Sequence, residues 1–178
     1  MMDLASVEAA LAQLPLYAVF RIRPEELEFT ERVRRVCEQE CPMYGRTWAC
    51  PPAVGTVDEC RRRCLGYENC LVMATVAEVS DIGNLEEALS TRPGHEAVTD
   101  AAAEILRSHG AVPYVLSTQA CALCQRCAWL DGEPCRFPGK MHPCVESHGI
   151  NLIPTLEKEG VEFLLDRQTV IWFSLLFY

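Results

Sequence analysis

TVIWFSLLF, residues 169–177, lies in the longest apolar run of the sequence. Its β-branched and aromatic side chains suit burial on a pleated surface, and the run is far shorter than the ~20 residues that a membrane-spanning helix needs. We therefore expect a buried strand here rather than a tail or a membrane anchor. A buried strand needs neighbours in a sheet, which other parts of the chain must supply.

Three other apolar segments are strand candidates: LYAVFRI (16–22), CLVMATVAEV (70–79) and AVPYVLSTQ (111–119). Helical patterns alternate with them at residues 4–14, 24–40, 57–67, 95–110 and 151–160. Pro24 suits a first helical turn and Thr56 suits an N-cap. Strands that alternate with helices favour an α/β fold. We expect one domain over residues 1–178, with a mixed or mostly parallel sheet flanked by helices and two cysteine-rich metal-binding loops.

Composition narrows the classes of function. The 178 residues are 49% hydrophobic, so the chain can bury roughly 70% of its unfolded surface without covalent cross-links. The N-terminal residues lack a basic region followed by an apolar run, which predicts a cytoplasmic protein. Eleven cysteines in that reducing compartment indicate metal binding or catalysis before disulfides. The net charge of −9 argues against nucleic acid or a membrane surface as partner.

The sharper of two cysteine groups lies in CALCQRCAWLDGEPCR, residues 121–136. Its members are Cys121, Cys124, Cys127 and Cys135, in the pattern C-x2-C-x2-C-x7-C. Consecutive C-x2-C steps are typical of 4Fe–4S ferredoxins, whereas a structural zinc ribbon uses two separated C-x2-C pairs. The spacing therefore predicts a 4Fe–4S cluster, with zinc as the alternative. The flanking glycine and prolines suit a loop that points backbone N–H groups at cluster sulfurs.

The other group comprises Cys37, Cys41 and Cys50, the last two of which bracket a loop and precede prolines. Three ligands for a second 4Fe–4S cluster are expected here. Cys60 and Cys64 stand one turn apart on a helix, so either could supply a fourth thiolate, and both could instead be small buried hydrophobes. The helix start at Thr56 favours Cys60.

Cys144 in HPCVESHG, residues 142–149, lies between two histidines. It could be a ligand or a reactive group, and an ordinary surface-loop cysteine is the simpler interpretation. Cys70 opens a predicted strand and is expected in the core.

The combination of RVRRVC, YGRTWACPP, CALCQRC, PCRFP and VESHGI resembles the cysteine-rich, predicted metal-binding proteins found mainly in anaerobic bacteria and archaea. The resemblance covers most of the chain from about residue 29 onward. It implies a cytoplasmic protein with two metal sites, expected to be iron–sulfur, and no assigned reaction. The positions that match the family's metal-site motifs are Cys37, Cys41, Cys50, Cys121, Cys124, Cys127 and Cys135, with Cys60 as a further candidate. Cys144 stands where similar proteins are expected to carry a small residue that is not a ligand.

Three functions fit these motifs. The first is an electron-transfer or redox accessory protein with two 4Fe–4S clusters. The second is a non-redox iron–sulfur enzyme, for sulfur removal or transfer, with one open iron. The third is a structural zinc-binding interaction module. No serine–histidine–acid order or phosphate-binding glycine loop identifies catalytic residues. The expected partner is a redox protein or a small-molecule substrate, and Arg61, Arg62 and Arg63 could face an acidic redox partner.

Overall fold

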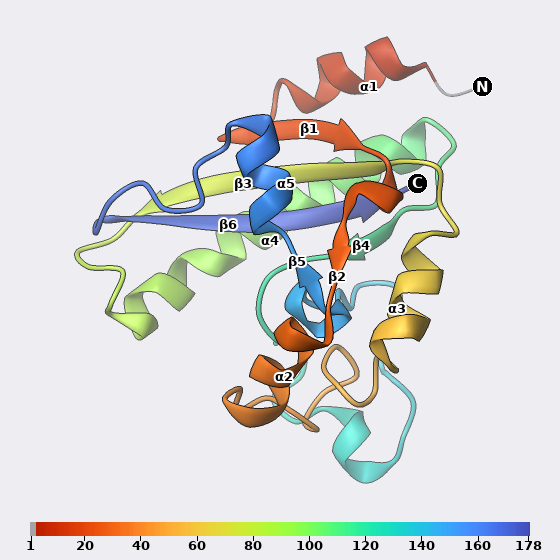
Figure 1. Ribbon diagram of the computed structural model, residues 1–178, viewed down its shortest axis with the longest axis vertical. Coiled ribbons are helices and arrows are strands. Elements are labelled where there is room, and N and C mark those ends of the chain that lie inside the picture. Colours follow the sequence, from red (N-terminus) through yellow and green to blue (C-terminus); the bar gives the residue numbers. More distant parts are fainter. Residues whose placement is uncertain (1–2) are drawn as a thin grey trace.

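The predicted C-terminal strand lies inside a four-stranded sheet. The computed structural model describes residues 3–178, and its main sheet comprises β1 (Ala18–Ile22), β3 (Cys70–Glu78), β6 (Thr169–Phe177) and β4 (Tyr114–Leu116) in the order β1-β3-β6-β4. β3 and β6 pair along their full lengths, from Cys70 opposite Phe177 to Glu78 opposite Thr169. Figure 1 shows these two long strands across the middle of the sheet.

The expectation of a mixed or mostly parallel sheet is wrong, because every neighbouring pair of strands in this sheet is antiparallel. β3 and β4 do run in the same direction, and α4 (Leu85–Ser108) connects them. They are not neighbours, however, since β6 enters between them and pairs with both. The alternation of strands and helices therefore predicts the crossover correctly, but it does not reveal which place in the sheet the last strand takes.

Both faces of the sheet are covered. On one face Leu71 and Met73 pack with α4 and with α1 (Leu4–Leu11), which lies beyond the β1 edge in Figure 1. On the other face Val72 and Ala74 belong to a second cluster with Leu156 of α5 (Ile153–Glu159). Burial on both faces explains why the β3 sequence is continuously apolar instead of alternating.

The helix predicted over 24–40 is interrupted. A short 3-10 turn, η1, covers Pro24–Glu26, β2 covers Glu28–Phe29, and α2 begins only at Glu31 and ends at Gln39. β2 pairs antiparallel with β5 (Ile150–Asn151) in a small second sheet, and the Thr30 side chain caps α2. The pairing partner lies more than a hundred residues away in the sequence, so local helical periodicity does not detect it.

The helix predicted after Thr56 is confirmed as α3 (Val57–Cys64). The Thr56 hydroxyl accepts from the Glu59 N–H at 3.2 Å, and the Glu59 carboxylate accepts from the Thr56 N–H at 2.7 Å. This reciprocal capping fixes the start of the helix. It also fixes the rotation of α3, which turns Cys60 and Cys64 inward.

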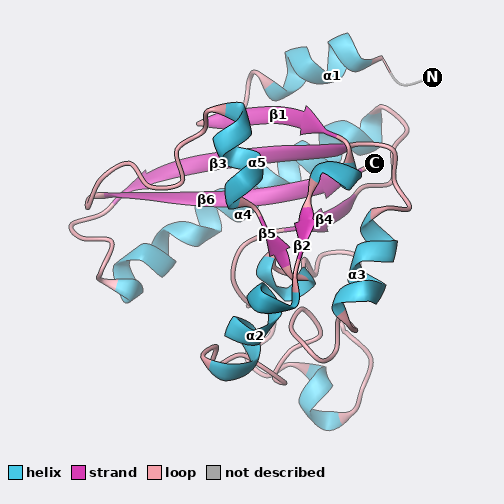
Figure 2. Ribbon diagram, viewed as in Figure 1, coloured by secondary structure: helices cyan, strands magenta, loops and turns pink. Residues whose placement is uncertain are grey.

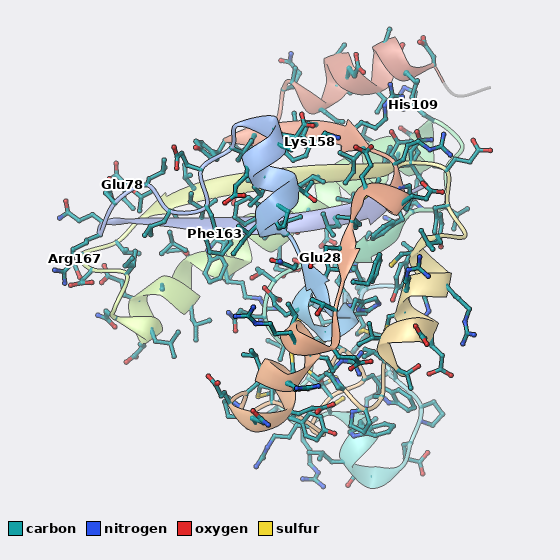
Figure 3. The ribbon with its side chains drawn as sticks, in the orientation of Figure 1. Glu28, Glu78, His109, Lys158, Phe163 and Arg167 are labelled. Atoms are coloured by element: carbon teal, nitrogen blue, oxygen red, sulfur yellow. The ribbon has the colours of Figure 1, made fainter. Side chains whose placement is uncertain are left out.

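The cysteine-bearing segments lie together outside the sheet, in a region we call the cysteine lobe (residues 37–55 and 119–145). In Figures 1 and 2 it lies below the sheet and is built largely from loops, with η2 (Ala128–Asp131) in the second segment. η3 (Glu146–His148) follows the lobe and packs against α2. Glu78 and Arg167, labelled in Figure 3, lie at the end of β3 and just before β6, away from the lobe. Within residues 3–178, no helix combines the length and apolar character needed to cross a bilayer.

Candidate metal centre

The second cysteine group lines one cavity of about 330 Å³. Cys121, Cys124, Cys127 and Cys135 all contribute to its wall, and each is partly exposed. Burial raises the pKa of Cys121, and negative charge on Cys127 and Cys135 raises it further. The spacing C-x2-C-x2-C-x7-C thus folds into a single enclosure lined by four thiols.

Two arginines of the loop that carries these cysteines form hydrogen bonds within the same loop. Arg126 donates to both Asp131 oxygens, at 2.7 and 3.3 Å, and Arg136 donates to the Arg126 carbonyl at 2.8 Å. Both arginines line the cavity together with Arg46 from the first segment. A thiolate-ligated cluster carries negative charge, so these three cations suit its rim.

Two tryptophans join the loops of the two cysteine groups. The Trp48 indole meets the Trp129 indole edge to face, with ring centroids 4.8 Å apart. Trp48 Nε1 donates to the Glu133 carbonyl at 3.0 Å, and Trp129 Nε1 donates to the Gly45 carbonyl at 2.9 Å. Each loop therefore supplies one indole to the other, and Trp48 also lines the cysteine cavity.

The first cysteine group lies beside this cavity. Cys37, in the last turn of α2, is buried, Cys50 is buried, and Cys41 is exposed. Burial, together with negative charge on Glu146, Cys41 and Cys50, raises the pKa of Cys37 to about 11. Without a metal, the Cys37 thiol is therefore protonated at neutral pH, and metal binding there would have to release this proton.

Cys50 connects the two groups. Burial raises its pKa, and charge on Cys41, Cys121 and Cys127 raises it further. It therefore interacts with members of both groups, which are separated by some seventy residues in the sequence. The cysteines expected to form two separate sites share one lobe.

The arrangement of thiols bears on the type of metal centre. Among residues 3–178, no three His, Cys, Asp or Glu side chains lie close enough together to hold a single metal ion. A zinc site needs four donors at one ion, whereas a cubane accepts each thiolate on a different iron. The Thr47 hydroxyl is buried in the cavity wall beside Cys50 and lowers the pKa of that thiol, so it lies where it can donate to a thiolate or a cluster sulfur. Four thiols around one cavity fit a cubane, which binds each thiolate on a different iron.

A comparison with known families matches residues 21–178 to DUF2284, described as a predicted metal-binding protein. The chain belongs to this family. The family resemblance inferred from the cysteine and proline motifs is thereby confirmed. No curated protein and no solved structure matches this DUF2284 chain.

In this DUF2284 protein Cys60 contacts two arginines. Its side chain is fully buried, Arg34 Nη2 lies 3.7 Å from the sulfur, and Arg63 Nη1 lies 4.0 Å from it. The thiol donates to the Val54 carbonyl at 3.4 Å. Burial raises the pKa of Cys60, and the two guanidinium groups oppose that rise. Cys64, one turn further on, packs in the core beside Cys70.

Arg34 is a feature of the DUF2284 site that sequence reasoning missed. It is 5% exposed and forms no ion pair with any carboxylate of residues 3–178. It donates to the carbonyls of Gly55 at 2.8 Å and Ser147 at 2.6 Å, and its Nε has no partner among the described groups. Its charge lowers the pKa of Cys37. The available signal was its position in RVRRVC, three residues before Cys37 on the same helix.

The surface-loop interpretation of Cys144 is wrong, because the residue is 8% exposed. Its segment forms a bridge with Ser117 beside the main sheet. Burial raises the pKa of Cys144 well above its ordinary value, with additional contributions from Glu146, Cys50 and Cys37. The flanking histidines have other partners: His142 bonds Asp100 at 2.9 Å and His148 bonds Tyr114 at 2.7 Å.

Proposed function

We propose that this DUF2284 protein holds two 4Fe–4S clusters and acts as an electron-transfer or redox accessory protein. One observation carries the proposal: all four cysteines of the ferredoxin-type spacing line a single cavity. Four thiolates saturate a cubane, and a bound cubane takes up or releases one electron without exchanging ligands.

The position of the first cysteine group, next to the second, supports a redox role for the two proposed clusters. Cys50 interacts electrostatically with Cys121 and Cys127, so clusters held by the two groups would be neighbours. Trp48 and Trp129 pack edge to face at the junction of the two groups. The buried Arg34 guanidinium beside Cys37 offsets negative charge at the first group. The matching partner is a redox protein that docks at the cysteine lobe.

A second function is favoured by the surroundings of Cys60. Its thiol is buried between Arg34 and Arg63, which leaves Cys37, Cys41 and Cys50 as the thiols of the first group. A cubane held by three protein thiolates has one iron that can accept a substrate as a Lewis acid. This arrangement fits a non-redox enzyme for sulfur removal or transfer. The zinc module is the least supported alternative, since the thiols do not converge on one point.

The deciding experiment is anaerobic purification with iron, acid-labile sulfide and zinc analysis, together with electron paramagnetic resonance spectroscopy. Two cubanes predict about eight irons and eight sulfides per chain. Stoichiometric zinc without sulfide would reject the iron–sulfur proposal. Reversible one-electron reduction would support the redox role, and a spectrum that changes on addition of small thiols would favour the open-iron enzyme.

A further inference from the structure

A second cavity, of about 550 Å³, adjoins the cysteine cavity. Trp48 and Met141 line both cavities and form the wall between them. The remaining lining residues come from the segment before α3, from α3, from the end of α4, from β4 with its preceding loop and from residues 138–143. This second cavity contains no cysteine in its wall, so its chemistry is separate from metal ligation.

The wall of the second cavity is basic in an acidic protein. Arg63 and Arg107 line it with His142, and none of the described lining residues is Asp or Glu, although the chain carries 25 acidic residues. Arg63 forms no ion pair within residues 3–178. The wall therefore attracts negative charge.

The other two basic residues of the wall, Arg107 and His142, each pair with an acidic side chain. Arg107 pairs with Glu104 at 3.1 Å, and His142 pairs with Asp100 at 2.9 Å. The glutamate side chain is 73% exposed, and such surface pairs contribute little. A ligand anion that enters the cavity can therefore compete for Arg107.

Arg63 is held in place by its neighbours. Its guanidinium carbon lies 5.7 Å from the centre of the Tyr114 ring, and Nη1 donates to the Tyr114 hydroxyl at 3.3 Å. Nη1 and Nη2 also donate to the Val54 carbonyl, at 3.4 and 3.3 Å. Its Nε has no hydrogen-bond partner among the residues described, so this group and the second Nη2 hydrogen remain for a ligand.

A buried histidine, His148, hydrogen-bonds the Tyr114 hydroxyl and holds the ring in place. The Tyr114 hydroxyl and His148 Nε2 lie 2.7 Å apart, and His148 is fully buried. Burial lowers the pKa of His148 to about 3 and raises that of Tyr114 to about 12. Both groups are neutral at physiological pH, so the hydroxyl donates to the imidazole and accepts from Arg63. The arginine is thus preorganised before any ligand arrives.

The rest of the wall is apolar and rigid. Trp48, Val112, Val115 and Met141 contribute apolar surface, and prolines at 113, 138 and 143 limit backbone motion. A bare inorganic anion would leave this surface unused. The wall suits a molecule with an anionic group at one end and an apolar body.

We propose that this cavity binds a small organic carboxylate, with Arg63 and Arg107 as the anion-binding residues. The site lies against the wall of the cysteine cavity, yet the proposal concerns binding alone and does not depend on the identity of the metal centre.

The test is calorimetric titration of the purified metal-loaded protein, at constant ionic strength, with benzoate, cinnamate and hexanoate. Benzyl alcohol serves as the uncharged counterpart of benzoate. At least one carboxylate should bind saturably, and benzyl alcohol should bind at least about tenfold more weakly than benzoate. Arg107→Ala and Arg63→Ala should each weaken carboxylate binding about tenfold, and Arg107→Ala should leave the metal content unchanged.

Arg62→Ala is the matched control, because Arg62 is exposed on the same helix and does not line the cavity. Its binding should equal that of the native protein. Arg107 is exposed, so its variant tests the proposal even if Arg63→Ala fails to fold. Failure of all three carboxylates to bind would overturn the proposal. Equal binding of benzyl alcohol and benzoate, or an equal loss in Arg62→Ala, would do the same.

Discussion

Trp48 and Trp129 lie edge to face at an interplanar angle of 73°, and each indole N–H bonds a backbone carbonyl of the loop that carries the other. The two loops come from opposite halves of the chain and carry most of the predicted ligands. Neither loop contains an α-helix or a strand of its own. The tryptophan pair therefore supplies part of the rigidity that these loops would otherwise lack.

Replacing the two indoles should reveal this coupling. Trp48→Leu and Trp129→Leu should each lower the free energy of unfolding, and a double-mutant cycle should give a coupling of about 0.5–1.5 kcal/mol. Denaturant unfolding measures both quantities. Trp172→Leu is the control, since its Nε1 donates to Thr91 on α4 rather than to either loop. A coupling near zero between positions 48 and 129 would show that the loops hold together without the pair.

The second cysteine group should load independently of the first. Cys124→Ser should remove about half of the iron. It removes a ligand of the second group only, and the ligands of the first group lie in a different loop. Iron and sulfide analysis after anaerobic purification measures the loss. Cys70→Ala, a core substitution in β3, should retain the full metal content. Complete loss of iron in Cys124→Ser would mean that the two groups form one inseparable centre.

The first group should retain its metal without Cys60. Cys60→Ala should leave the iron content unchanged, because the structure holds this thiol between Arg34 and Arg63. The resonance spectrum of the variant should match that of the native protein with and without added small thiols. A loss of about four irons would instead identify Cys60 as the fourth ligand of the first group.

Stability should fall at acidic pH through His95 on α4. His95 is 2% exposed and bonds Thr75 at 2.8 Å and Ser174 at 2.7 Å. Burial lowers its pKa from 6.5 to about 4. Between these values the unfolded state binds the proton and the folded state does not, so stability is lost as the pH falls. The expected slope is about 1.4 kcal/mol per pH unit.

His95→Gln tests this contribution. Its free energy of unfolding should depend on pH less steeply than that of the native protein between pH 6.5 and 4. At pH 8 the difference between the two proteins reports only the change in packing and hydrogen bonding. Parallel curves over the acidic range would show that His95 does not titrate as its burial requires.

The central strand should be sensitive to truncation of its side chains. Leu175→Ala in β6 should destabilise the protein by about 2–5 kcal/mol, because this side chain is fully buried. Leu164→Ala should change stability by less than about 0.5 kcal/mol, since Leu164 is 60% exposed. Thermal or denaturant unfolding distinguishes the two. Similar effects at both positions would place β6 at the periphery of the core.

Sequence patterns predicted the features that depend on interactions between residues close together in the chain. Thr56 as an N-cap predicted α3. The spacing of Cys121, Cys124, Cys127 and Cys135 predicted that they act at one site, and in the structure they line one cavity. The apolar character of residues 169–177 predicted β6. Each of these features depends on residues close together in the sequence.

Pairings between distant segments could not be predicted in this way. β6 enters between β3 and β4, and β2 pairs with β5, because side chains far apart in sequence bury each other. The same holds at the candidate site: Cys50 interacts with Cys121, and Arg34 reaches Ser147. Charge and burial at these positions follow from the tertiary fold, so a single sequence does not reveal them.

The central position of β6 has a consequence for the order of events during protein synthesis. All of the predicted ligands, from Cys37 to Cys135, leave the ribosome before residues 169–177 do. Until β6 emerges, β3 and β4 have no strand between them and the sheet cannot close. The nascent chain therefore presents its thiols to the cell before it has a scaffold to orient them. Stable metal insertion is then expected only once β6 has emerged and paired with both strands, so that the metal meets a lobe held by a closed sheet.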